Sequence, residues 1–203
     1  MLLALFSFAQ AGPVPLQFDL SVGGTIYPTV ERSELTESGA DFGVRVGYAV
    51  QPWLVPYVGA TFGGGGMDHY FENDDAYVDD YASTFRSAYV EDQFLAGVKF
   101  AWQPNRYFGL YGRAQGQLVY GDLRIDDDLD TDDNPGQLEY SGLSGGATGV
   151  LGLEAAAPVA ADVFAVTFHL EGGYTWNAPL HLGDVAALDL QGAVIRAGIG
   201  ARF

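Results

Sequence analysis

Residues 192–203 read GAVIRAGIGARF and alternate strictly between two kinds of side chain. Ile195, Ala197, Ile199 and Ala201 form an apolar row, and the positions between them carry two arginines and two glycines. Period-two alternation indicates a β-strand with two different faces. In a soluble protein the aliphatic row would need a core to cover it, and glycines on the water side would serve no purpose. The pattern therefore favours a strand whose apolar face meets something other than water.

Seven further segments of the chain alternate in the same way. Together with the C-terminal segment they predict eight strands, each close to the roughly ten residues that a tilted strand needs to cross a bilayer. The seven segments are LQFDLSVGGTIYP (16–28), DFGVRVGYAV (41–50), LVPYVGATF (54–62), QFLAGVKFAW (93–102), YFGLYGRAQGQLVY (107–120), TGVLGLEA (148–155) and VFAVTFHLEGGYTW (163–176).

The connections between these segments also alternate in length. Short turns are predicted around Gln51-Pro52, at 103–105 and at 158–162, and long polar loops at about 31–40, 63–90, 121–146 and 177–189. An even number of strands with short turns at one end and long loops at the other is typical of a bacterial outer-membrane β-barrel. Both termini then lie on the short-turn, periplasmic side, where the first strand (about 15–29) and the last (about 190–203) would close the barrel.

The two faces of the strands separate a membrane barrel from a soluble barrel of lipocalin type. A soluble barrel is apolar inside and mixed outside, whereas here one face is almost purely apolar and the other carries charged residues, amides, threonines and glycines. An apolar exterior in lipid and a polar interior satisfy both rows. We therefore predict an all-β fold, an eight-stranded antiparallel up-and-down transmembrane β-barrel. The predicted lipid-facing row includes Phe18, Val46, Val98, Leu118, Phe168 and Ile199.

The composition excludes several kinds of partner and site. The chain of 203 residues contains 26 acidic and 9 basic residues, which gives a formal net charge of −17. Such acidity argues against a nucleic-acid partner, because phosphate contacts need Lys and Arg. The absence of cysteine excludes a disulfide framework and a cysteine-based metal site.

The N-terminal MLLALFSFAQA (1–11) is a short apolar run that ends in the small-residue pattern Ala9-Gln10-Ala11. It predicts a signal peptide cut after Ala11 and a barrel domain over residues 12–203. No Lys or Arg precedes the apolar run, so an N-terminal core segment is the alternative interpretation.

Aromatic residues gather at the ends of the predicted strands. Trp53, Trp102 and Phe108 flank the short turns, and Tyr120, Tyr174 and Trp176 lie at the opposite ends of their strands. Amphipathic rings at both ends are typical of the two aromatic girdles of a membrane barrel.

The chain ends on Phe203, preceded by apolar residues at every second position. This resembles the sorting signal that outer-membrane barrels present to the barrel assembly machinery. Together with the eight alternating segments, residues 12–203 resemble the small eight-stranded OmpA-like and OmpX-like outer-membrane barrels. The resemblance implies a location in the bacterial outer membrane and contact with membrane lipid and lipopolysaccharide, and we expect a monomer.

Charged residues on the polar row are expected to line the lumen. With five bases against four acids, they predict a network of ion pairs that fills the barrel, because buried charge is tolerated only when paired. Four of them, Asp19, Lys99, Glu154 and Arg202, are expected near the periplasmic turns, and Glu171 is expected to contact Arg113 or Arg196. The predicted network is Asp19, Arg45, Glu91, Lys99, Arg113, Glu154, His169, Glu171, Arg196 and Arg202.

A catalytic site is not expected in this chain. Lipid A deacylases of this size use a His and a Ser two residues apart on one lipid-facing strand, whereas the nearest match, His169-Leu170-Glu171, has Glu in place of Ser and points inward. We expect a structural or interaction role through acidic extracellular loops. A narrow pore or small-solute transporter of OmpW-like type is the alternative, and a lipid A-modifying enzyme comes third.

The segment MDHYFENDDAYVDDYASTF (67–85) mixes acids with Tyr and Phe. Tyrosine-rich surfaces suit binding. Alternatively, these rings pack on strands that continue above the membrane.

A second acidic segment has the oxygen spacing of an EF-hand loop, with Asp128, Asp130 and Asp132 followed by Glu139 eleven residues after Asp128. Position 6 of such a loop should be Gly and is Asp133, so only the spacing matches. Because these acids repel one another, we expect weak Ca²⁺ binding here, on the order of 10⁻⁴–10⁻³ M, and no other cofactor.

Overall fold

The structure, a computed structural model, describes residues 16–26, 40–71, 83–127, 137–160, 164–182 and 186–203. The signal peptide predicted at 1–11 lies outside these residues. No helix among them is long and apolar enough to cross a membrane. The strands are β1 (Leu16–Ile26), β2 (Ala40–Tyr48), β3 (Leu54–Phe71), β4 (Ser83–Trp102), β5 (Phe108–Asp127), β6 (Gln137–Ala160), β7 (Phe164–Asn177), β8 (Leu180–Leu182), β9 (Ala186–Leu188) and β10 (Gly192–Arg202).

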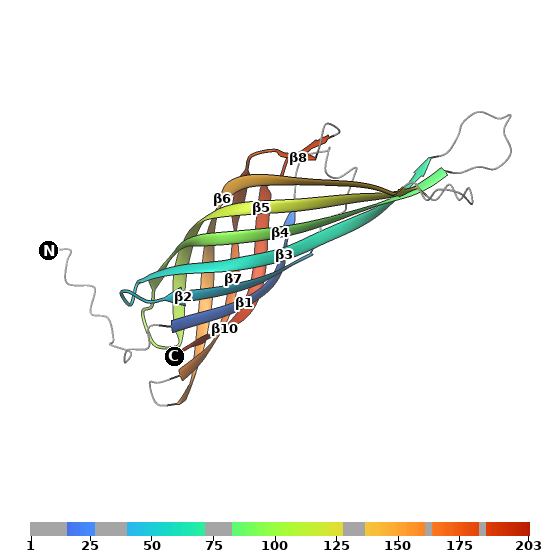
Figure 1. Cartoon of the computed structure of the whole chain (residues 1–203). Coiled ribbons are helices and arrows are strands. Elements are labelled where there is room, and N and C mark those ends of the chain that lie inside the picture. The colour runs from blue at the N-terminus through green and yellow to red at the C-terminus, as the bar shows by residue number, and fades with distance from the viewer. Residues whose placement is uncertain (1–15, 27–39, 72–82, 128–136, 161–163, 183–185) are drawn as a thin grey trace, which may run out of the picture.

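Eight of these strands form a closed barrel in the order β1-β10-β7-β6-β5-β4-β3-β2, with every pair antiparallel (Figure 1). The predicted closure between the first and last strands is confirmed: Phe18 pairs with Ala201 and Ile26 with Ala193. The C-terminus lies at the end of the short turns, away from the long ends of β3 to β6 (Figure 1).

The four strands β3 to β6 continue well past the other strands (Figure 1). β3 loses its partner β2 after Gly64 but stays paired with β4 as far as Phe71, and β6 is paired with β5 from Gln137 although β7 joins it only at Gly146. We call these protruding parts of β3 to β6 the extension. The prediction of loops at 63–90 and 121–146 is therefore wrong for the described parts of both ranges.

The physical reason is that inward-facing apolar residues still alternate with outward-facing residues in the extension, although acidic residues are frequent there. Tyr89 and Leu123, directly opposite one another on β4 and β5, are buried, whereas the next residue on β4, Val90, is exposed. On the outer face Arg124 lies opposite Glu139, and an ion pair joins them. Opposite charges facing each other across two strands stabilise their pairing.

The loop predicted at 177–189 is wrong in part, because it contains the last residue of β7, Asn177, and the short hairpin of β8 and β9. This hairpin forms a two-stranded sheet of its own, separate from the barrel wall. The leucines of the hairpin alternate with polar and small residues, but each alternating run is too short to predict a strand from the sequence.

The barrel carries its apolar residues outside and its charges inside. Val46, Leu118, Phe168 and Ile199 are between 41% and 54% exposed, and Phe18 and Val98 occupy the same outward row with partial burial. Inside, Arg45 and Glu171 are each only 2% exposed. An apolar belt around a polar interior is the distribution that lipid requires and water disfavours.

Candidate functional site

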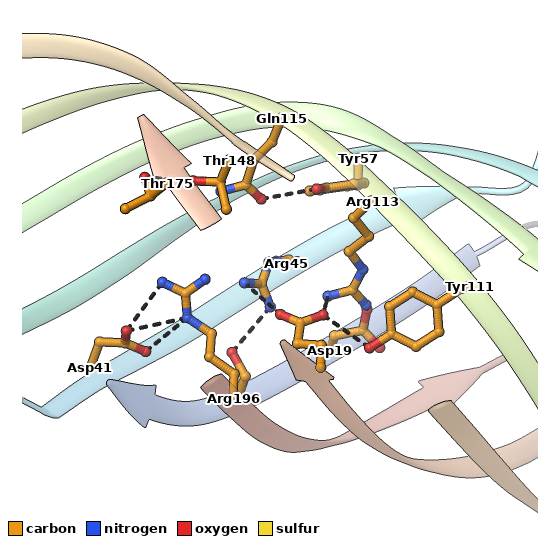
Figure 2. A network of polar contacts seen from close by, with 12 residues as sticks. Asp19, Asp41, Arg45, Tyr57, Tyr111, Arg113, Gln115, Thr148, Thr175 and Arg196 are labelled. Atoms are coloured by element: carbon orange, nitrogen blue, oxygen red, sulfur yellow. Dashed lines mark hydrogen bonds and ion pairs between the residues drawn. The ribbon is translucent and has the colours of Figure 1, made fainter. Parts of the chain in front are cut away.

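A network of ions and hydroxyl groups crosses the middle of the lumen. Glu171 on β7 accepts hydrogen bonds from Arg113 Nη1 over 3.0 Å and from the Tyr111 hydroxyl over 2.9 Å. Arg45 Nη2 lies 3.4 Å from the other carboxylate oxygen of Glu171. Arg113 also donates from Nη2 to Asp19 over 2.6 Å (Figure 2). One carboxylate and one guanidinium therefore tie β1, β2, β5 and β7 together.

A second ion pair lies beside this centre. Arg196 on β10 donates to both carboxylate oxygens of Asp41 on β2, with Nε–Oδ1 at 3.0 Å and Nη2–Oδ2 at 3.1 Å (Figure 2). In register Arg196 faces Glu171, yet it binds Asp41. Sequence reasoning did not include Asp41, although it shares the row of Arg45 four residues further on.

The third group lies toward the periplasmic turns. Glu154 accepts from Lys99 Nζ over 2.6 Å and from Gln103 over 3.4 Å, and it forms an ion pair with Arg202. Asp19, predicted at this level, bonds Arg113 of the central network instead, because the register of β1 and β2 places it opposite Arg45.

Above the ions lies a layer of amides and hydroxyl groups without charge. Gln117 donates to Thr175 and to Asn177, each over 2.8 Å, and Thr148 donates to Gln117 over 2.7 Å. Gln115 donates to Gln117 over 3.2 Å and so joins this layer to Tyr57 on β3, whose hydroxyl donates to Gln115 over 2.9 Å.

Glycines on the lumen row make these contacts possible. Gly23 on β1 pairs with Arg196 on one side and with Asp41 on the other, so the arginine reaches its partner across a strand that has no side chain there. A Cβ atom at Gly23 would collide with the Arg196 side chain. Three other hydrogen-bonded pairs follow the same rule across a glycine, namely Tyr57–Gly97–Gln115, Tyr111–Gly152–Glu171 and Gln117–Gly146–Asn177.

The ten residues predicted for the lumen all lie on its inner face, nine of them buried and Arg202 partly so. Glu91 accepts from the Tyr89 hydroxyl over 3.1 Å and from Gln93. His169 lies over Gly198, and neither ring nitrogen has a hydrogen-bond partner among the described residues. With Asp41 added, the described lumen holds five bases and five acids, and ion pairs join every one of those bases to an acid.

The predicted calcium ligands Asp128, Asp130 and Asp132 lie outside the described residues. Glu139 is described, and its carboxylate forms an ion pair with Arg124 Nε at 3.4 Å. Among the residues that the structure describes, no group of three or more His, Cys, Asp or Glu side chains is placed to hold a metal ion.

The His169-Leu170-Glu171 segment points as predicted. His169 and Glu171 are buried in the lumen, and Leu170 is exposed on the lipid side. Glu171 is engaged by two arginines and a tyrosine, so the segment presents no nucleophile to lipid.

An apolar exterior, a filled polar lumen and closure between the first and last strands together define the architecture. The chain is an eight-stranded outer-membrane-type β-barrel.

No protein-family model matches the sequence, and no curated protein matches it either. Similar solved structures include Ail, the attachment invasion locus protein of Yersinia pestis, in complex with the heparin analogue sucrose octasulfate: 16% identity, 94% of this chain and 100% of that chain covered, TM-score 0.44. Neisserial surface protein A matches at 12% identity, with 93% and 96% covered and a TM-score of 0.45. A major outer membrane protein from Thermus thermophilus matches at 14% identity, with 94% and 100% covered and a TM-score of 0.46.

Proposed function

We propose that this protein is a closed, non-enzymatic barrel of the bacterial outer membrane, which acts by binding a cationic partner through its acidic extension. The barrel is the scaffold, and the extracellular ends of β3 to β6 together with their connections are the binding surface. The filled lumen is the observation that carries the proposal.

We expect the side chains that cross the described lumen to block the passage of solutes. The central ion pairs of Glu171, Arg113 and Asp19 run across the barrel between strands that are not neighbours. Pulling one member out would leave its partner charged and buried, which typically costs about 3–5 kcal/mol. A barrel of eight strands is just wide enough for such side chains to fill it.

The extension is the part of the barrel that stands clear of the membrane, and its chemistry is acidic. On its outer face Arg124 Nε lies 3.4 Å from both Asp122 and Glu139. The sequence continues with Asp and Glu at 72–80 and 126–133. Complementary charge speeds association and selects the partner, so a partner with a basic surface suits this face best.

The remaining partners follow from the membrane setting. The apolar belt would contact membrane lipid and lipopolysaccharide, whose negative charge would repel the acidic extension unless divalent cations lie between them. The backbone amide of Phe203 donates to the carbonyl of Leu16 over 3.1 Å and its ring lies 5.1 Å from that of Phe164. The residue that would address the assembly machinery thus lies at the closing seam of the barrel, and we expect the folded protein to be a monomer.

A narrow pore is the second candidate function, supported by one observation. His169, Arg45 and Arg113 each carry a buried nitrogen without a hydrogen-bond partner among the described residues, which is the chemistry that attracts water into a polar lumen. Lipid A modification is third, and its test is mass spectrometry of lipid A from cells with and without the protein.

Two measurements on the refolded barrel test the proposal. In planar bilayers we expect no stepwise current from the wild-type protein; regular single-channel steps would replace the proposal with the pore. In nanodiscs we expect a lysine-rich peptide to bind with an affinity that falls as salt rises, and a glutamate-rich peptide of equal length to fail to bind. Equal binding of both peptides would overturn the cationic partner.

A further inference from the structure

The extension is an open sheet, unlike the closed barrel from which it rises. Among the described residues, β3 pairs only with β4 beyond Gly64, and β6 pairs only with β5 before Gly146. In this part of the chain the sheet has two edges, and closure does not reinforce its pairing. Such a sheet is stable when one apolar face packs against another element.

The hairpin of β8 and β9 supplies this packing on the inner face of the extension. Tyr89 on β4 and Val119 and Leu123 on β5 are each no more than 2% exposed. In the described structure they share one buried apolar cluster with four leucines of the hairpin segment, Leu180, Leu182, Leu188 and Leu190. Ile125 on β5 and Tyr140 on β6 pack against the same cluster. The leucines therefore contact three of the four strands of the extension.

Two glycines of the extension let the hairpin come close. A Cβ atom at Gly121 on β5 would collide with Leu180 and Tyr89. One at Gly142 on β6 would collide with the carbonyl oxygen of His181. The absence of a side chain at these two positions allows the leucines to reach the face of the sheet.

Hydrogen bonds fix the hairpin segment at its base. The Ala178 amide donates to the carbonyl of Gly145 over 2.9 Å, and the Ser144 hydroxyl donates to the carbonyl of Ala178 over 2.6 Å. Asn177 Nδ2 donates to the carbonyl of Leu190 over 3.0 Å and ties the two ends of the segment together. The segment is thus held to the barrel below and packs against the extension above.

We propose that the leucines of β8 and β9 are a fixed support that holds the extension in its paired form. The inference rests on the proposed function, because the surface that the support positions is the acidic one assigned to the cationic partner. Leu180, Leu182 and Leu188 are positioning residues, since they act on the partner only through the strands they contact. Loss of their packing would loosen the upper parts of β4 and β5 and disperse the acidic side chains of Asp122 and Glu139, while the barrel below stays closed.

Hydrogen exchange of backbone amides, measured on the refolded barrel in nanodiscs, tests the support. Leu182→Ser puts a hydroxyl group into the apolar cluster and should speed the exchange of residues 87–91 and 121–125 about tenfold or more. Residues 96–100 and 112–116, deeper in the same two strands, should exchange as slowly as in the wild type. The same variant should bind the lysine-rich peptide about threefold or more weakly, because the complementary charges are no longer held in one arrangement.

Two variants of β8 are the matched controls. His181→Ser changes an exposed side chain next to Leu182 and should leave both exchange and peptide binding unchanged. Leu182→Met keeps an apolar side chain of similar size and should stay close to the wild type in both measurements. If Leu182→Ser fails to refold, Leu188→Ser on β9 replaces it. Failure of both to refold would show that the cluster stabilises the whole barrel and would overturn an effect confined to the extension.

The support and the proposed function fail in different measurements. Unchanged exchange of residues 87–91 and 121–125 in Leu182→Ser would overturn the support, even if peptide binding fell, because the hairpin would then contact the peptide directly. Faster exchange along the whole of β4 and β5 would overturn it as well, and so would faster exchange of the extension with unchanged peptide binding. A wild-type protein that binds no lysine-rich peptide would overturn the proposed function alone, since the exchange measurement needs no ligand.

Discussion

Arg196 on β10 binds Asp41 on β2 across Gly23 of β1, with 3.0 Å between Nε and Oδ1. The two partners lie on strands that do not pair with each other, and the glycine between them pairs with both. Three more polar pairs in the lumen span a glycine in this way, so these glycines allow side chains to meet across an intervening strand. The central ion pairs of Arg113 with Asp19 and of Arg45 with Glu171 run across the barrel instead.

The first prediction concerns the coupling of this pair. Asp41→Asn and Arg196→Gln should each destabilise the barrel, because each leaves a buried charge without its partner. In a double-mutant cycle the interaction energy should fall within about 0.5–3 kcal/mol. Urea titration of the refolded proteins in lipid measures it, and strictly additive effects of the two changes would mean that the pair contributes nothing specific.

The second prediction concerns the central carboxylate. Glu171→Gln removes the charge that Arg113 and Arg45 share and should cost about 3–5 kcal/mol of unfolding free energy. Glu139→Gln, on an exposed ion pair of the extension, should change stability by no more than about 0.5 kcal/mol. Equal effects of the two substitutions would show that the lumen network does not stabilise the barrel.

The third prediction tests the glycine rule. Gly152 lies beneath the ring of Tyr111, on the strand between Tyr111 and Glu171. Gly152→Val should therefore overpack the lumen and cost about 1–3 kcal/mol. Gly149→Val on the same strand, outside the barrel, should cost much less, and the two midpoints of unfolding in urea make the comparison. If Gly152→Val left the midpoint of unfolding unchanged, the contact between Tyr111 and Glu171 would not require a glycine on the strand between them.

The fourth prediction concerns the lipid face. We expect Val98 near the midplane of the bilayer, where Val98→Arg should destabilise the barrel by roughly 2–4 kcal/mol. We expect Leu143 nearer the extracellular end, where Leu143→Arg should cost roughly 0–1 kcal/mol. Refolding titrations in lipid vesicles measure both. Equal destabilisation by the two substitutions would contradict the expectation that Val98 lies deeper in the bilayer than Leu143.

The sequence was sufficient to predict the barrel because the lipid environment constrains the outward face of every strand. Each strand must present an unbroken apolar row, as Phe168 and Leu170 do on β7, and such a row is visible in one dimension. The inward direction of His169 and Glu171 followed from the same parity. These predictions needed only local alternation.

Partners within the lumen could not be predicted in the same way. Asp41 binds Arg196 because β1 pairs with β2 and with β10 in a particular register. The alternation within one segment does not determine the register between strands that are far apart in the sequence. The extension was missed because dense aspartates around Leu123 resembled a loop, and the hairpin was missed because Leu180 and Leu188 gain their partners only in three dimensions.

The last prediction concerns calcium. Asp128, Asp130, Asp132 and Glu139 keep the oxygen spacing of a calcium loop, and binding on the order of 10⁻⁴–10⁻³ M stays a prediction. The ion pair between Glu139 and Arg124 adds a condition, because the guanidinium competes with the cation for the same carboxylate and repels it. Arg124→Gln should therefore tighten Ca²⁺ binding, whereas replacing the three aspartates together by Asn should abolish it. Calorimetry on the refolded proteins separates the two effects: identical heats for the wild type and the triple variant would remove the site, and weaker binding in Arg124→Gln would remove Glu139 from it.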